Sequence, residues 1–126
     1  EKLISLVKTA VSISSKPVTC KLRMGWDKPV LHEFVEKIQD TGVKGIVVHA
    51  RTAQQGYSGS ADWEYIKQIK SQLSIPLIGN GDIRNAKDVI EKLSAVVIRM
   101  YFCYEIAPHS IISNSFGALP TLNLRH

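Results

Sequence analysis

The chain has 126 residues, of which 44% are hydrophobic and 21% charged, so it can bury a core and does not have the composition of a disordered chain. Its formal net charge of +5 favours polyanionic partners but does not by itself identify RNA as one of them. Two cysteines form neither a metal-binding spacing nor a disulfide framework, and no apolar run approaches the roughly 20 residues of a membrane span. From these features we expect a cytoplasmic protein with no metal site and no membrane segment.

Apolar residues recur at helical spacing and at strand spacing in turn along most of the chain. The helical pattern begins directly at Glu1, which suggests a segment of a longer protein. The expected elements are a helix over residues 2–14, a strand over 18–23, a helix opened by residues 27–29, a strand over 45–49, a helix capped by Asp62, a strand over 75–79, a helix over 85–93 and a strand over 95–98. The last helix is expected to turn four residues inward: Ala86, Val89, Ile90 and Leu93.

Alternation of helices and strands is typical of α/β proteins with a parallel sheet and right-handed crossovers. A complete eight-stranded (β/α) barrel needs about 250 residues, and the pattern in this chain supplies only the last four strands. We therefore predict a partial TIM barrel over residues 1–99. Beyond it the pattern fails, and we predict an irregular tail over residues 100–126 with a short helical stretch near residues 104–113.

Polar side chains stand where each expected strand ends, and the ends of parallel strands gather at one edge of the sheet. Lys21 and Arg23 share one face of the first strand, and the apolar Cys20, expected to be inert, lies on the other. The cation of Lys21 could hold the electron-rich edge of a flavin and stabilise its reduced anion. A solvated lysine on an edge strand fits the pattern equally well, so both interpretations stay open.

The ends of the second and third strands also carry candidate binding groups. His49 and Arg51 are expected to share a face opposite Lys21, where they could cradle an anion or a flavin. A core histidine that binds a backbone carbonyl is the more common alternative. Residues 79–82, Gly-Asn-Gly-Asp, lie between a strand and a helix, where glycines admit a ligand and a helix N-terminus favours phosphate. A tight turn without a ligand is the alternative there.

The loop over residues 57–63 combines aromatic rings with small polar side chains. Aromatic rings can stack on nucleic-acid bases, and Arg51 could bind a phosphate. The alternative is a folded loop that Trp63 pins to the core. We favour the core position for Trp63 and expect a mixed role for Tyr57.

Four segments in this order carry a family resemblance: Lys21-Leu22-Arg23-Met24-Gly25-Trp26-Asp27, Val48-His49-Ala50-Arg51-Thr52, Tyr57-Ser58-Gly59-Ser60-Ala61-Asp62-Trp63 and Ile78-Gly79-Asn80-Gly81-Asp82. In order, spacing and residue type, the series resembles the tRNA-dihydrouridine synthases over roughly residues 16–84, and most of all their bacterial-type branch. The resemblance implies an FMN-binding barrel. In this family NADPH reduces the flavin, which then reduces the C5=C6 bond of a uridine flipped out of tRNA.

The same resemblance assigns roles to individual residues. Six are implied to hold FMN, the first two at its ring or ribityl chain and the others on its phosphate side: Lys21, His49, Asn80, Gly81, Asp82 and Arg99. Three are implied to face the tRNA: Arg23, Arg51 and Tyr57.

The chain departs from the family pattern in two ways. The earlier half of the barrel, with its proton-donating cysteine, is not in it, so we expect no catalytic residue here and an inactive segment. After Ile98 the family's Gly-Arg segment gives way to Arg99 and an unrelated tail. Open barrel edges are expected to promote self-association. Two alternative functions stay open: another FMN barrel oxidoreductase acting on a small molecule, and a non-catalytic remnant that binds RNA or protein.

Overall fold

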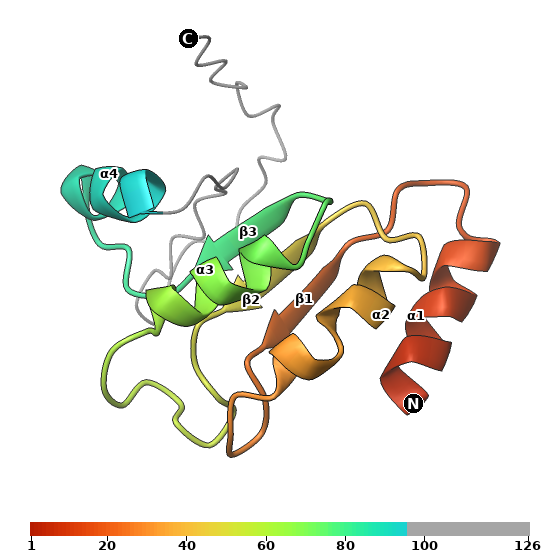
Figure 1. The fold of residues 1–126 in the computed structure, drawn as a ribbon, viewed down its shortest axis with the longest axis horizontal. Coiled ribbons are helices and arrows are strands. Elements are labelled where there is room, and N and C mark those ends of the chain that lie inside the picture. The colour runs from red at the N-terminus through yellow and green to blue at the C-terminus, as the bar shows by residue number, and fades with distance from the viewer. Residues whose placement is uncertain (96–126) are drawn as a thin grey trace, which may run out of the picture.

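The computed structural model describes residues 1–95, which form helices packed on a three-stranded parallel sheet (Figure 1). The elements are α1 (Lys2–Ile13), β1 (Cys20–Arg23), the 3-10 helix η1 (Leu31–Glu33), α2 (Val35–Gln39), β2 (Ile46–His49), α3 (Trp63–Ser71), β3 (Leu77–Asn80) and α4 (Ala86–Ala95). The sheet order is β1-β2-β3, with both pairs parallel. This confirms the predicted α/β class and is consistent with part of a TIM barrel.

Several predictions fall beyond residue 95. The fourth strand was expected to begin at Ala95, which is instead the last residue of α4. The rest of that strand, Arg99, the tail over 100–126 and its short helix lie outside the described residues. The boundary between barrel and tail therefore stays a prediction.

The three strands run in step, so their side chains form straight rows across the sheet. Arg23, His49 and Asn80 are register partners at the carboxyl ends of the strands. Two residues earlier, Lys21 is in register with Val47 and, through it, with Ile78. Because side chains alternate along a strand, both rows project from the same face of the sheet.

The opposite face carries the core, and α2 and α3 cover it (Figure 1). The side chains of the strands and of these two helices that are fully enclosed are all aliphatic: Val35, Ile38, Ile46, Val48, Ile66, Ile69 and Leu77. Enclosing each such side chain stabilises the fold by about 1.5–3 kcal/mol. The helix predicted after Asp62 is confirmed as α3, and its buried side chains include Trp63, Ile66 and Ile69, with Leu73 buried just beyond its end. Burial also raises the pKa of the Cys20 thiol, which disfavours the thiolate.

The helix expected to open at residues 27–29 begins later, because the chain first closes a loop. The Met24 carbonyl accepts hydrogen bonds from the backbone N–H groups of Val30 and Leu31, both at 2.9 Å. Gly25 is required inside this loop, since a Cβ there would collide with the carbonyl oxygen of Lys28. Helical structure then follows in η1 and α2, where Leu31, Val35 and Ile38 are buried.

The inward orientation expected for α4 is wrong for two of its residues. Ile90 is 68% exposed, and Ala86 is exposed as well, whereas Val89 is partly buried. An amphipathic pattern defines a face but does not supply a surface to cover it, and α4 lies to one side of the sheet (Figure 1). Among residues 1–95, no helix is long and apolar enough to cross a membrane.

Candidate functional site

The candidate site lies where the three strands end. Arg23, His49 and Asn80 form the last row of the sheet, on the face that α2 and α3 leave uncovered. Lys21 stands on the same face one row earlier and is exposed. The guanidinium of Arg23 is fixed by donating to the Thr52 carbonyl at 3.0 Å. The register therefore brings together four residues from three strands that are separated in the sequence.

A tight turn ends β2 directly after the buried His49. The backbone N–H of Arg51 donates to the His49 carbonyl at 2.7 Å, while Ala50 donates to the Asn80 carbonyl at 3.0 Å. Strand alternation therefore stops at His49. The sequence pattern predicts that Arg51 shares a face with His49. In the structure it does not, and its side chain turns toward the loop that follows β3.

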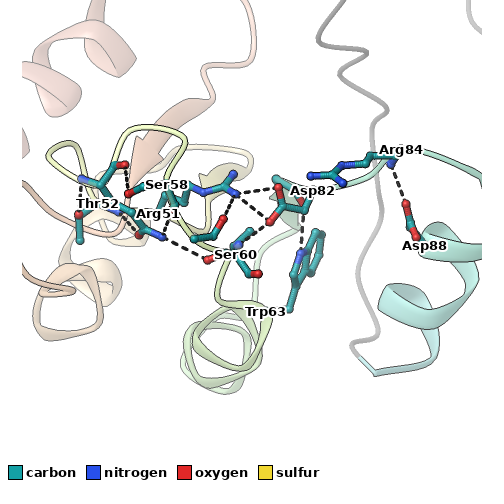
Figure 2. A network of polar contacts seen from close by, with 12 residues as sticks. Arg51, Thr52, Ser58, Ser60, Trp63, Asp82, Arg84 and Asp88 are labelled. Carbon is teal, nitrogen blue, oxygen red and sulfur yellow. Dashed lines mark hydrogen bonds and ion pairs between the residues drawn. The ribbon is translucent and has the colours of Figure 1, made fainter.

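That side chain forms an ion pair with Asp82 (Figure 2). The Nη2 atom of Arg51 lies 2.8 and 2.9 Å from the two carboxylate oxygens of Asp82 and also donates to the Gly59 carbonyl at 2.9 Å. Asp82 accepts a further hydrogen bond from the backbone N–H of Ala61 at 2.5 Å. The pair thus joins the loop after β2 to the loop after β3.

The electrostatics of this pair follow from its contacts. Partial burial by itself raises the pKa of Asp82, but the Ala61 N–H and the Arg51 guanidinium outweigh it, with a smaller contribution from Arg84. The net result is a pKa below the ordinary value, so Asp82 is ionised at neutral pH. Arg51 is only 4% exposed and already bound to Asp82. Its role in facing RNA stays a prediction, and its evident task is to hold two loops together.

The turn over residues 79–82 is shaped by close approaches that only glycine permits. Gly81 has φ 120°, and a Cβ there would lie 2.8 Å from the Ala61 Cβ and 3.1 Å from the His49 Cδ2. A Cβ on Gly79 would lie 2.5 Å from the indole of Trp63. That indole donates to the Gly81 carbonyl at 3.0 Å and is buried, which confirms the core position favoured for it (Figure 2).

The loop after β2 has a defined fold. Gln55 organises it by donating from its side chain to the carbonyls of Ser58 at 2.9 Å and Ser60 at 3.2 Å. Its own backbone N–H donates to the hydroxyl of Thr52 at 3.2 Å. Tyr57 projects from this folded loop with 68% of its surface exposed. Its predicted contact with RNA therefore has an accessible ring.

The sheet face opposite α2 and α3 carries residues that are compatible with a flavin. Val47 and Ile78 give it a partly exposed apolar centre, and Lys21 supplies a cation beside them. His49 and Asn80 supply polar groups at the strand ends. An apolar surface with a few polar groups at its edge is typical of cofactor sites. The residues present therefore fit FMN, and their individual contacts with it stay predictions.

Sequence reasoning assigned no role to Trp26, which the structure exposes at the same edge. An aromatic residue directly after a glycine in a strand-end loop was the available signal.

Comparison with known proteins gives a consistent result. The family model described as "Dihydrouridine synthase (Dus)" matches residues 1–98. The chain is 45% identical over 98 residues to a "Probable tRNA-dihydrouridine synthase" of Rickettsia bellii, which covers 71% of this chain and 29% of that protein. It is 49% identical over 74 residues to the "tRNA-dihydrouridine(16) synthase" of Vibrio parahaemolyticus, a match that covers 57% of this chain and 23% of that protein. The chain thus spans less than a third of the length of these curated relatives.

Proposed function

The chain belongs to the dihydrouridine synthase family, and on that premise we propose that it is part of an FMN-dependent, NADPH-driven oxidoreductase that reduces the C5=C6 bond of uridine in tRNA. The observation that carries the proposal is the row of Arg23, His49 and Asn80, with Lys21 beside it on the uncovered face of the sheet. The names of the relatives support tRNA as the substrate.

In this proposal FMN, when bound, supplies the hydride, and the residues of this chain orient it. Lys21 places a positive charge at the ring, where negative charge develops as the ring is reduced. His49 binds the ring or the ribityl chain, and Asn80 lies on the phosphate side. Gly81 lets the backbone approach the phosphate side, with Arg99 as a further contact from outside the described residues.

Asp82 acts on that site indirectly. Its carboxylate carries the same sign of charge as a phosphate, and it is already shared between Arg51 and the Ala61 N–H. We therefore assign it the task of fixing the loop that contains Gly81.

We also propose that this chain alone does not turn over. Its Cys20 lies on the helix-covered side of the sheet, so its thiol does not reach a uridine bound at the opposite face. Burial also raises the pKa of this thiol, which makes it a weaker acid. Cys103 lies outside the described residues. In the described part, β1 and β3 each pair on one side only, which supports the expectation of self-association.

Titration of the purified chain with FMN, followed by flavin fluorescence, tests the flavin site. We expect saturable binding that Lys21→Ala and Asn80→Ala each weaken by about tenfold, the value of one well-placed polar contact. Lys37→Ala is the matched control, because Lys37 is exposed on α2, on the other side of the sheet. No binding, or equal binding by all variants, would contradict the proposed site.

A second assay tests activity. Unmodified tRNA, NADPH and FMN are incubated with the chain, and dihydrouridine is measured by mass spectrometry of the digested RNA. We expect none, and its formation would contradict the proposed inactivity. Retained RNA binding without FMN binding would instead favour the alternative of a non-catalytic remnant.

A further inference from the structure

Trp26 is 71% exposed in the loop that connects β1 to η1. Tryptophan has the largest apolar side chain and is highly buried on average, as Trp63 is here. Leaving most of an indole in water therefore calls for an explanation, and a bound partner is one.

Flexibility of the loop does not explain this exposure, because backbone hydrogen bonds hold Trp26 and the two residues before it. The carbonyl of Trp26 accepts from the N–H of Gln54, and that of Gly25 accepts from the N–H of Ala53, both at 2.9 Å. Directly before these residues, the Met24 carbonyl closes the loop onto η1. The indole is thus presented from a fixed backbone, which reduces the entropy lost when a partner binds.

The same hydrogen bonds fasten this loop to the one that carries Tyr57, and the two loops lie side by side beyond the strand ends (Figure 1). The described part of the chain exposes five large hydrophobic side chains: Leu6, Ile13, Trp26, Tyr57 and Ile90. The three aliphatic ones lie on α1 and α4, and both aromatic ones lie on these joined loops. The aromatic surface is therefore concentrated at the carboxyl edge of the sheet.

Charge at this edge favours an anion. Residues 50–61 contain no Asp or Glu, and their one cation, Arg51, is paired with Asp82. Asp27 is offset by the adjacent Lys28, and Lys21 and Arg23 add positive charge on the neighbouring sheet face. Aromatic rings beside cationic groups are the usual means of binding unpaired nucleotides, since every base has a face on which to stack.

We propose that Trp26, together with Tyr57, forms a stacking platform for unpaired bases of the RNA substrate, beside the flavin site and separate from it. This inference rests on the proposed function for the identity of its partner. It adds a binding residue, Trp26, and a mode of contact that depends on base faces and not on phosphate charge.

Binding of an unmodified tRNA transcript to the full 126-residue chain tests the inference, measured by anisotropy of labelled RNA over a range of salt concentrations. We expect Trp26→Ala to weaken binding by about tenfold and Tyr57→Ala by a similar or smaller factor, as is typical for loss of one stacked base. The salt dependence should stay unchanged, because no phosphate contact is removed. Trp26→Phe should recover most of the affinity. Leu6→Ala, which truncates an equally exposed side chain on α1, should bind like the unaltered chain.

Three further readouts separate the outcomes. A blunt RNA duplex, whose bases are already stacked, should bind equally well to the unaltered chain and to Trp26→Ala. An equal loss for duplex and tRNA would overturn the inference. Conversion of a self-associated chain to a monomer by Trp26→Ala, with unchanged tRNA affinity, would overturn it in favour of a protein contact. A chain that binds FMN but no tRNA would overturn it and leave the flavin site standing.

Discussion

The guanidinium of Arg51 and the carboxylate of Asp82 lie 2.8 Å apart, although 31 positions separate the two residues in the sequence. Their contact fixes the loops that follow β2 and β3 relative to each other. Asp82 reaches this position with φ 56°, a left-handed conformation that, apart from glycine, mainly Asn and Asp adopt. The row formed by His49 and Asn80 lies directly before these two loops, so the ion pair fixes the backbone beside the candidate site.

Asp82→Asn tests the contribution of the charge. The substitution keeps an acceptor of similar shape but leaves the buried Arg51 cation without its counter-ion, and we expect a loss of about 2–3 kcal/mol in the free energy of unfolding. Urea denaturation at neutral pH measures it. Asp27→Asn, at an exposed aspartate in another loop, is the matched control and should change stability by less than about 0.5 kcal/mol. Equal effects of the two substitutions would contradict a stabilising role for the pair.

The pH dependence of stability should report the same carboxylate. The folded pKa of Asp82 lies below its unfolded value, so its contribution is fully present above about pH 4 and is lost as the pH falls through the folded pKa. The asparagine side chain of Asp82→Asn does not titrate, so that variant lacks this pH-dependent contribution. Urea denaturation at a series of acidic pH values should therefore show the stability difference between the two chains shrinking as the pH falls. A difference that stays constant down to the lowest pH would contradict the lowered pKa.

Gly79 should tolerate no side chain, because the sheet and α3 meet there. A Cβ would lie 2.5 Å from Cζ3 and 2.8 Å from Cη2 of Trp63, so Gly79→Ala must displace the indole that donates to the Gly81 carbonyl. We expect a loss of about 1–3 kcal/mol, as for other overpacked cores. Gly45→Ala is the control, since its Cβ would meet the Pro76 carbonyl oxygen at an ordinary 3.4 Å. Comparable losses in the two variants, measured by urea denaturation, would argue against the clash.

Local signals in the sequence were sufficient for the three strands that the structure describes and for the positions of the residues at their ends. Each strand is a short β-branched run followed by polar residues, and parallel strands end at one edge, so the row of Arg23, His49 and Asn80 could be expected. The alternation that hides Cys20 and exposes Lys21 was equally accessible.

Features that depend on distant parts of the chain could not be predicted. The turn after His49 breaks strand alternation and sends Arg51 to Asp82, a contact that no local pattern encodes. The late start of the second helical segment depends on the Met24 carbonyl, which closes a loop across Pro29. The exposure of Ile90 depends on which surfaces α4 meets, and periodicity alone does not determine that.

The effects of replacing Asp62 and Asp27 on stability show how far the local sequence pattern determines where a helix begins. Both precede segments expected to be helical, but only Asp62 acts as a cap, with its Oδ1 accepting from the Tyr65 N–H at 2.9 Å. Asp62→Ala should therefore destabilise the chain by about 1 kcal/mol. Asp27→Ala should be close to neutral, because the chain around it forms the loop closed by Met24. Thermal unfolding followed by circular dichroism compares the two, and a larger effect at Asp27 would contradict the observed helix start.

Tyr65 and His32 connect α3 to η1 through a contact that the sequence did not suggest. The Tyr65 hydroxyl accepts from the backbone N–H of His32 at 3.0 Å and lies 2.9 Å from its Nδ1. Tyr65→Phe keeps the ring in the core but leaves that backbone donor without its partner, so we expect a loss of about 1–2 kcal/mol in the free energy of unfolding. Ser71→Ala removes an exposed hydroxyl of α3 that donates to the Gln68 carbonyl at 2.7 Å, and it should change stability by less than about 0.5 kcal/mol. Amide hydrogen exchange at His32 provides an independent readout. Faster exchange there in Tyr65→Phe, but not in Ser71→Ala, is the result expected if the Tyr65 hydroxyl holds η1 against α3.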